Sequence, residues 1–265
     1  MRNLTGRRVL ITGASSGIGQ CLAEQAAALG AKVLLAARSA DTLETLARKL
    51  RAAGHQAVAA PADITAEADR KRLISVAEQE FGGLDVLINN AGVASFGHFA
   101  GSTEAILRQV METNFFAPSE LIRTALPLLK VGTQPAIVNV ASMCGRRGLP
   151  AWPEYSASKF ALCGLTEALR AEMARFDIDV LLILPGLTNT GLGQHLLRNE
   201  GRMALDYSQG MTPAYVARSI LDAVQNNRLE TVLGREARWM LRINRFFPGL
   251  VNRLLVRKVG QLYAH

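Results

Sequence analysis

The sequence predicts an α/β protein built on a doubly wound parallel sheet. Short apolar runs alternate with helical patterns along most of the chain, as in strands joined by crossover helices. The runs are apolar throughout, for example over 33–37, so helices are expected to cover both faces of the sheet. A glycine-rich turn over 12–19 separates the first apolar run from the first helical pattern. These observations predict one domain over 1–234, followed by a helical extension over 235–265.

Seven strands and six helices follow from the patterns in this domain. The expected strands are 8–12, 32–37, 56–60, 84–89, 136–140, 179–184 and 231–233. The expected helices are 17–29, 40–53, 66–80, 103–130, 154–176 and 213–226. No internal repeat or linker interrupts this alternation, which predicts a single seven-stranded sheet.

Composition narrows the class of protein. Apolar residues make up 49% of the 265 residues and charged ones 20%, which is typical of a globular chain. The N-terminus lacks an apolar signal segment, and no apolar run approaches the roughly eighteen residues of a membrane span. Three scattered cysteines favour a reducing, cytoplasmic location, and the four histidines show no ligand spacing, so we expect no catalytic metal.

The turn after the first strand has the chemistry of a phosphate-binding loop. Thr12 and Gly13 are followed by Gly17 and Gly19, and a helical pattern begins within the turn. Helix amides and the helix dipole would then face a pyrophosphate. A second polar segment, 89–92 (Asn-Asn-Ala-Gly), ends the fourth strand. Together they predict a nucleotide site at one edge of the sheet.

Ser142, Tyr155 and Lys159 form a candidate catalytic set. Tyr155 and Lys159 are four residues apart and therefore share a helical face. A free tyrosine has a pKa of about 10, and an ammonium about 4 Å away is worth roughly 4 kcal/mol at an effective dielectric near 20. We therefore expect Lys159 to lower the pKa of Tyr155, so that the phenol exchanges protons near neutrality. Ser142 would hold the same oxygen, and Cys144 either lines the site or packs inertly.

These motifs, in this order, resemble the short-chain dehydrogenase/reductase family in its classical branch, over roughly residues 5–234. The resemblance implies a Rossmann fold, a nicotinamide cofactor and a catalytic set of Asn114, Ser142, Tyr155 and Lys159. It implies that Asn114 opens its helix locally and holds a water that relays protons to Lys159. The cofactor-binding residues implied by the family are Gly13, Ser15, Ser16, Gly17, Ile18, Gly19, Arg38, Ser39, Asp63, Ile64, Asn90, Ala91, Gly92, Tyr155, Lys159, Pro185, Gly186, Thr188 and Thr190.

The residues after the second strand predict NADP rather than NAD. An acidic residue at this point binds a ribose 2′-hydroxyl, whereas an arginine accommodates a 2′-phosphate. Ala37 stands where an NAD-binding relative carries Asp, and Arg38 follows it. The guanidinium of Arg38 can pair with a phosphate through two donors, and Ser15 and Ser39 can add hydroxyl donors.

The expected function is an NADP(H)-dependent oxidoreductase that reduces a carbonyl, or oxidises the corresponding secondary alcohol, of an apolar small molecule. The segment 190–210 corresponds to the family's substrate lid. Its apolar residues either contact the ligand or pack on the loop's own core: Leu192, Leu196, Leu197, Met203 and Leu205. The alternatives are a non-catalytic NADP-binding redox sensor and a membrane-associated scaffold.

A basic extension ends the chain. Residues 228–265 carry eight cations and two acids, so eight minus two gives +6 of the total +8. Over 235–247, arginines recur on one helical face and Trp239, Ile243, Phe246 and Phe247 on another. We favour packing on the body or on a sister subunit, which would bury Trp239, Phe246 and Phe247. The main alternative is that the extension contacts a membrane surface peripherally. Nucleic acid is not expected as a partner.

A homodimer or homotetramer is also expected. In the family, the long helices at 103–130 and 154–176 commonly pair across a two-fold axis. Both carry apolar residues that exceed what one sheet face needs: Leu121, Ile122, Leu126, Phe160 and Leu165.

Overall fold

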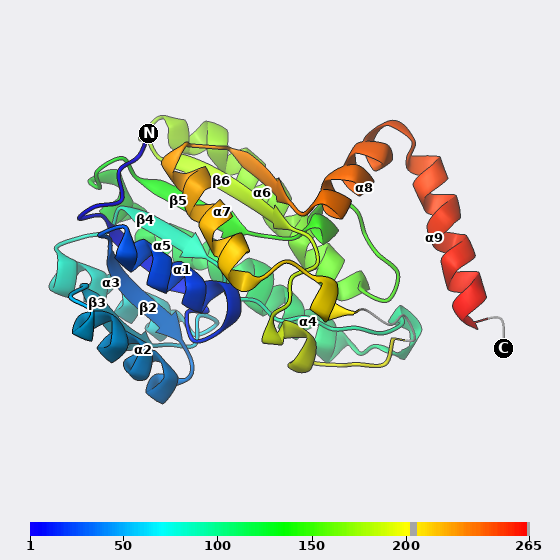
Figure 1. Ribbon diagram of the computed structural model, residues 1–265, viewed down its shortest axis with the longest axis horizontal. Helices are drawn as coiled ribbons and strands as arrows, with labels where there is room; N and C mark the ends of the chain where they lie inside the picture. Colours follow the sequence, from blue (N-terminus) through cyan, green and yellow to red (C-terminus); the bar gives the residue numbers. More distant parts are fainter. Residues whose placement is uncertain (202–205, 264–265) are drawn as a thin grey trace.

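The computed structural model describes residues 1–201 and 206–263 (Figure 1). Seven parallel strands form one sheet in the order β3-β2-β1-β4-β5-β6-β7. Their bounds are β1 Arg8–Thr12, β2 Lys32–Ala37, β3 Ala57–Pro61, β4 Val86–Asn89, β5 Ala136–Val140, β6 Asp179–Pro185 and β7 Glu230–Leu233. The predicted fold class is therefore confirmed, with strand ends within two residues of those expected.

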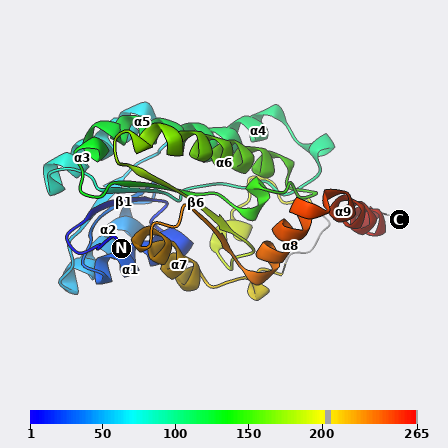
Figure 2. The same ribbon diagram turned by 90° about the horizontal axis from the view of Figure 1, so that it is seen from above.

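Helices cover both faces of the sheet (Figure 2). Their bounds are α1 Gly17–Ala28, α2 Ala40–Ala52, α3 Glu67–Phe81, α4 Glu104–Met111, α5 Ala117–Lys130, α6 Pro153–Ala174, α7 Pro213–Gln225, α8 Arg235–Phe246 and α9 Pro248–Tyr263. One layer holds α1, α2 and α7, where Leu22 and Leu43 are fully buried. The other holds α3, α4, α5 and α6, where Leu73 and Leu121 are fully buried. Each such leucine contributes about 1.5–3 kcal/mol of burial free energy.

The long helix expected over 103–130 is interrupted at its centre. Residues Glu112–Phe116 form a π-helical turn between α4 and α5, with buried Asn114 inside it. Such turns widen a helix by one residue and are frequent at functional sites. The prediction that the helix opens locally at Asn114 is confirmed.

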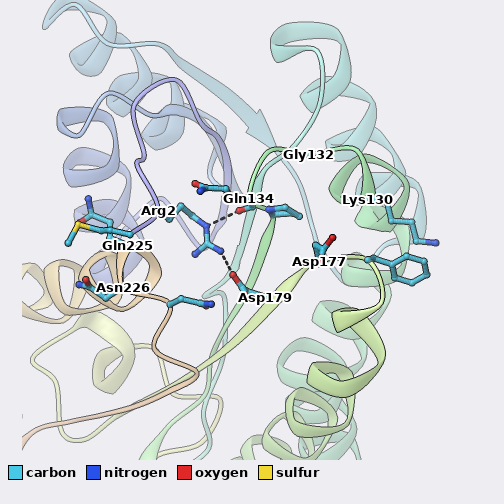
Figure 3. Close-up of a pocket in the computed structure, with 12 residues that line it drawn as sticks. Arg2, Lys130, Gly132, Gln134, Asp177, Asp179, Gln225 and Asn226 are labelled. Atoms are coloured by element: carbon cyan, nitrogen blue, oxygen red, sulfur yellow. Dashed lines mark hydrogen bonds and ion pairs between the residues drawn. The ribbon is translucent and has the colours of Figure 1, made fainter.

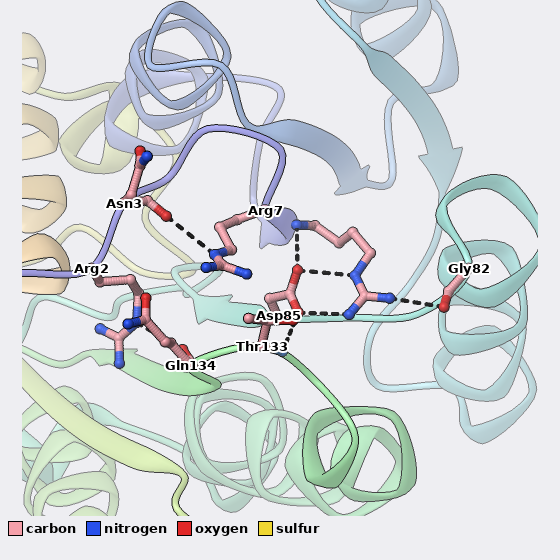
Figure 4. A network of polar contacts seen from close by, with 8 residues as sticks. Arg2, Asn3, Arg7, Gly82, Asp85, Thr133 and Gln134 are labelled. Atoms are coloured by element: carbon pink, nitrogen blue, oxygen red, sulfur yellow. Dashed lines mark hydrogen bonds and ion pairs between the residues drawn. The ribbon is translucent and has the colours of Figure 1, made fainter.

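Two arginines, Arg2 buried and Arg8 partly buried, secure the amino ends of the strands, on the edge opposite the glycine turn. Arg2 donates to the carbonyl oxygen of Gln134 at 2.8 Å and pairs with Asp179 at 2.5 Å, beside a pocket of about 540 Å³ (Figure 3). Arg8 donates through Nε and a terminal nitrogen to both carboxylate oxygens of Asp85, at 2.9 and 2.6 Å (Figure 4). These pairs join β1, β6 and the start of β4, and hold this end of the sheet together.

The apolar surplus expected on the long helices is smaller than predicted. Leu121 and Ile122 are 0% and 3% exposed and belong to the core beneath α5, so they are not available to a partner subunit. Leu126 also packs partly against this core. Phe116 and Phe160 are the large aromatic side chains that stay exposed within the described helices of this layer, at 48% and 45%.

The extension forms two helices that project from the body (Figures 1 and 2). Helix α8 ends before Pro248, where α9 begins. The expected burial of the three aromatics is wrong: Trp239, Phe246 and Phe247 are 59%, 71% and 62% exposed. The opposite side of α8, with Ala237 2% exposed, packs on the body instead. Among the described residues, no helix has the length and apolarity needed to cross a membrane.

Candidate active site

A cavity of about 1080 Å³ opens at the carboxyl ends of the strands. It lies where the strand order changes direction between β1 and β4, the usual position of ligands in open parallel sheets. All of the predicted cofactor-binding residues except Gly19 line it. The structure therefore brings together segments that are dispersed over nearly two hundred residues of sequence.

The glycines of the first turn let three backbone segments approach closely. Gly13 has a φ of +68°, and a Cβ there would lie 3.0 Å from the Cα of Ala91. A Cβ on Gly19 would collide with the carbonyl oxygen of Gly13. Gly19 therefore does not line the cavity; it lets α1 pack against its own turn.

Sequence reasoning missed the role of Thr12, whose side chain joins the two nucleotide-facing turns. The Thr12 hydroxyl oxygen accepts hydrogen bonds from the backbone N–H groups of Asn90 and Ala91, both at 3.0 Å. The Asn90 side-chain amide in turn donates to the carbonyl oxygen of Thr12 at 2.9 Å. The position of Thr12 at the end of β1, beside the Asn-Asn-Ala-Gly turn after β4, is the feature of the sequence that could have indicated this role.

The amino end of α1 is open toward the cavity. Ser16 has extended backbone geometry, and within the described chain its side chain makes no capping hydrogen bond to the helix. The first amides of a helix lack partners inside the helix and attract anions. Because Ser16, Gly17 and Ile18 line the cavity, these donors are available to an anionic ligand.

Arg38, Ser39 and Thr42 lie together at one end of the cavity. Arg38 is exposed at the end of β2, where its guanidinium can reach an anion without losing a buried contact. Thr42, one turn into α2, was not predicted, although its spacing from Ser39 places it on the same side of the helix. Asp63 lines the same end and accepts hydrogen bonds from the Thr65 amide and hydroxyl at 2.9 and 2.7 Å.

Ser142, Tyr155 and Lys159 meet at the centre of the cavity. Ser142 follows β5, and its hydroxyl oxygen accepts from the Cys144 amide at 3.2 Å. Lys159 is only 4% exposed and donates to the carbonyl oxygen of Val140 at 3.1 Å. Its Nζ lies 5.7 Å from the centroid of the Tyr155 ring. This is the arrangement that the spacing on α6 predicted.

The electrostatics of this set differ from those expected. Desolvation by the surrounding protein raises the pKa of Tyr155 well above its usual value, and a hydrogen bond with Ser142 opposes that rise only in part. Burial also lowers the pKa of Lys159 to about 8, so its ammonium group loses a proton more easily than that of a free lysine. The expectation of a lowered Tyr155 pKa is therefore wrong for this structure, because desolvation of the phenol outweighs the hydrogen bond with Ser142 that lowers it.

Cys144 lines the cavity as an unreactive thiol. It is 7% exposed, and burial raises its pKa to about 11. Since the thiolate is the nucleophilic form, Cys144 contributes surface to the site and little reactivity at neutral pH.

Asn114 supports the site from behind the cavity wall. Its carbonyl oxygen accepts from the Val93 amide at 2.9 Å, and its amide donates to the Val93 carbonyl oxygen at 2.9 Å and to the Ser158 hydroxyl at 3.0 Å. Ser158 then donates to the carbonyl oxygen of Tyr155 at 2.8 Å. Asn114 thus fixes the loop after β4 against the helix that carries Tyr155.

Ser158 was not singled out from the sequence. Its position directly before Lys159, three residues after Tyr155, was the only signal that could have indicated it.

The far wall of the cavity is mainly apolar. The apolar side chains that line it are Leu149, Pro150, Trp152, Leu192, Leu197, Met240 and Leu255. Of the predicted lid residues, Leu192 and Leu197 face the cavity, whereas Leu196 packs with Phe96 and Trp152. Met203 and Leu205 lie outside the described residues. Met240 and Leu255 come from α8 and α9, whose part in the site the sequence did not reveal.

Comparisons with known proteins agree with this architecture. A family model for short chain dehydrogenases matches residues 7–201. An uncharacterized oxidoreductase, YxnA of Bacillus subtilis, is 34% identical over 96% of this chain and 73% of its own length. The ketoacyl reductase HetN of a Nostoc species is 32% identical over 96% of this chain and 90% of its own. Dehydrogenase/reductase SDR family member 7B of Bos taurus is 33% identical over 94% and 80%.

Solved structures give the same result. A short chain dehydrogenase/reductase from Burkholderia phymatum, in complex with NAD, superposes with a TM-score of 0.86 at 26% identity, covering 94% of this chain and 96% of that one. An alcohol dehydrogenase from the archaeon Thermococcus sibiricus, complexed with 5-hydroxy-NADP, gives 0.77 at 24% identity, over 86% and 95%. The second likeness supports the fold alone.

Proposed function

The chain belongs to the short-chain dehydrogenase family, a family of oxidoreductases, and from this premise we propose that it is an NADP(H)-dependent carbonyl reductase. The substrate would be an apolar small molecule, and the reverse reaction would oxidise the corresponding secondary alcohol. One observation carries the proposal: a single cavity has Arg38 at one end, Ser142, Tyr155 and Lys159 at its centre, and an apolar wall beyond them.

The residues present fit a dinucleotide. The glycine turn and the open end of α1 offer backbone donors to a pyrophosphate. Gly17 lies beside Thr190, since a Cβ added at Gly17 would touch the Thr190 side chain at 3.5 Å. Arg38 would hold the 2′-phosphate, and the turn from Pro185 to Thr190 would hold the nicotinamide end. When bound, the nicotinamide supplies a hydride to the carbonyl carbon.

Three side chains would handle the proton and the charge. Tyr155, kept neutral by its raised pKa, donates its O–H to the carbonyl oxygen and releases the proton as the alkoxide forms. Ser142 donates a second hydrogen bond that stabilises the developing negative charge. Lys159, whose pKa is about 8, is largely an ammonium at pH 7 and can favour the Tyr155 phenolate once the proton has left.

Asn114 would act through Lys159 and Tyr155 as a positioning residue. A Cβ added at Gly92 would lie 3.1 Å from the Asn114 carbonyl oxygen and 3.5 Å from Lys159 Nζ, so Gly92 separates the two side chains. In the proposed mechanism, Asn114 orients a water that returns a proton to Lys159 between turnovers.

The apolar wall supports an apolar substrate. Trp152, Leu192 and Leu255 offer contact area, while Tyr207 and His195 add polar groups nearby. A pocket of this kind selects its ligand mostly by shape and apolar burial. Similarity to a ketoacyl reductase supports a ketone attached to an acyl chain as the first class to test.

A non-catalytic redox sensor is the second candidate, and turnover separates the two. NADPH absorbance should fall when the protein is given acyl or cyclic ketones, and Tyr155→Phe should reduce the rate at least a hundredfold while NADPH affinity stays within about threefold. Tyr215→Phe, at a 48% exposed tyrosine on α7, is the matched control and should leave the rate unchanged. NADPH binding without turnover of any ketone or alcohol would favour the sensor instead.

A further inference from the structure

The two C-terminal helices present an apolar surface that no part of the described chain covers. We call it the α8–α9 face and define it by its exposed apolar side chains: Trp239, Ile243, Phe246, Phe247, Leu250 and Leu254. Their exposed fractions range from 38% for Ile243 to 71% for Phe246. Several exposed aromatic and aliphatic side chains on two consecutive helices mark an interaction site on a soluble body.

The same face is strongly basic. Residues 235–265 carry six arginines and Lys258 against Glu236, so seven minus one gives +6, and +8 minus +6 leaves +2 for residues 1–234. Along α8 the arginines recur at 235, 238, 242 and 245, directly beside the row formed by Trp239, Ile243 and Phe246. Charge and apolar area therefore lie side by side on the outward half of the helix.

The face is held in place from its inner side. Ala237 and Val251 are 2% and 7% exposed, so each helix buries one apolar residue toward the protein. Arg147 reaches from the loop after Ser142 and donates to the side-chain oxygens of Asn244 at 3.3 Å and Asn252 at 3.2 Å. These contacts hold the inner sides of both helices against the body. The aromatic side chains on the outer side of α8 therefore remain available to a partner.

The helices also border the candidate active site. Glu236 and Met240 of α8, with Leu255 and Lys258 of α9, line the same cavity as Tyr155. Whatever binds the α8–α9 face therefore lies at the mouth of the substrate pocket.

The charge and shape of the face decide between possible partners. A second copy meeting it face to face would bring the arginines of one α8 against those of the other, which is repulsive. Nucleic acid would match the arginines but leave the apolar row exposed to water. An anionic bilayer satisfies both features, since phosphate headgroups meet the cations and the acyl boundary takes up the aromatics.

We propose that the α8–α9 face docks on an anionic membrane surface, with Trp239, Phe246 and Phe247 inserted at the acyl boundary. Docking places the rim formed by Met240 and Leu255 against the lipid, so an apolar carbonyl compound can enter the pocket from the bilayer. The entry route rests on the proposed function; the docking itself does not.

Tryptophan fluorescence tests the docking directly. The chain has two tryptophans, and Trp152 is 6% exposed inside the body, whereas Trp239 is 59% exposed on the face. With vesicles of 70% phosphatidylcholine and 30% phosphatidylglycerol, the emission should shift to shorter wavelength and be quenched by brominated acyl chains. With Trp239→Phe the response should vanish while the protein still floats with the vesicles. Pure phosphatidylcholine should bind at least tenfold more weakly.

Charge reversal supplies the matched comparison. Arg242→Glu with Arg245→Glu should weaken vesicle binding at least tenfold, and so should Phe246→Ser with Phe247→Ser. Arg48→Glu with Arg218→Glu makes the same charge change on exposed residues of α2 and α7 and should leave binding within about twofold. Melting temperatures of all variants should stay near that of the parent, which shows that the loss is not unfolding.

Several results would overturn the proposal. The first two are absence of binding to the anionic vesicles and an equal loss of binding in the α2 and α7 control. A shift of Trp239 emission that depends on protein concentration without lipid would indicate self-association instead. Tight binding to a DNA duplex that the Phe246→Ser, Phe247→Ser variant retains would indicate a nucleic-acid partner. Tyr155→Phe should bind vesicles like the parent. Failure of that variant to lose turnover would therefore refute the proposed function and leave the docking intact.

Discussion

The Lys159 ammonium nitrogen lies 5.7 Å from the centroid of the Tyr155 ring; Lys159 is 4% exposed and Tyr155 is partly buried beside the cavity. Burial works against both charged forms, since it lowers the pKa of Lys159 and raises that of Tyr155. The protein therefore retains a strained ammonium at its active site, and this has a measurable effect on stability.

The contribution of Lys159 to the stability of the protein without cofactor should become more favourable as the pH rises from 8 to 10.5. The pKa of Lys159 is about 8 in the folded state, against 10.5 when unfolded. Across this window the unfolded chain binds more protons at this lysine, so the contribution of Lys159 to the free energy of unfolding increases with pH, by about 2 kcal/mol by pH 9.5. Below pH 8 the full cost of the buried ammonium is present. Thiols ionise in the same range, and the raised pKa values of buried Cys144 and Cys163 act in the opposite direction. The contribution of Lys159 is therefore measured as a difference between the parent and a variant that lacks the amine.

Lys159→Met isolates this contribution, because it keeps the stem and removes the amine. At pH 7 the variant should be more stable than the parent in urea unfolding, and the difference should shrink toward pH 9.5. A difference that stays constant with pH would contradict a lowered Lys159 pKa.

Arg38→Asp should weaken NADPH binding about tenfold to more than a hundredfold and leave NADH binding unchanged or improved. A hydrogen bond to a charged group is worth about 1.5–3 kcal/mol, and the new carboxylate would repel the 2′-phosphate. Calorimetric titration with both cofactors measures the change. Arg48→Asp, on the outer side of α2, is the control and should bind like the parent. If the parent binds NADH as tightly as NADPH, the NADP proposal fails.

Phe160→Arg should convert a homo-oligomer into a monomer. Phe160 and Phe116 are the half-exposed aromatics on the layer of helices that carries α5 and α6, so any two-fold pairing of this layer would bury them. Light scattering at micromolar concentration gives the mass of each species. Val131→Arg, at a 78% exposed residue after α5, should leave the mass unchanged. A monomeric parent would refute the expected assembly.

The sequence predicted what depends on local pattern. Strands such as β1 and β2 were placed correctly because apolar runs and glycine turns are properties of adjacent residues. It did not predict the bond between Asn114 and Ser158, which are 44 residues apart, or the raised pKa of Tyr155, which depends on what surrounds the ring. Nor did it predict that α8 and α9 border the pocket, because their placement depends on contacts such as those of Arg147.

The Arg8–Asp85 pair offers a test of the fold away from the active site. Asp85 is 2% exposed and accepts from the Arg8 backbone and guanidinium and from the Thr133 amide at 2.7 Å. Although burial opposes it, these hydrogen bonds lower the pKa of Asp85. The stability it contributes is therefore present above the unfolded-state pKa of about 4 and lost as the pH falls through the lower folded value.

Asp85→Asn should lower the free energy of unfolding by about 3 kcal/mol at pH 7. Breaking a buried ion pair costs roughly 3–5 kcal/mol, and the Arg8 side chain is 19% exposed, which places the effect at the lower end. The melting temperature should fall by roughly 6–10 °C. Glu78→Gln, on the exposed side of α3, should change stability by less than about 0.5 kcal/mol. The difference in stability between Asp85→Asn and the parent should close as the pH falls below 4. A difference that persists there, or a fall in melting temperature of less than 2 °C at pH 7, would show that this pair does not hold β1 to β4.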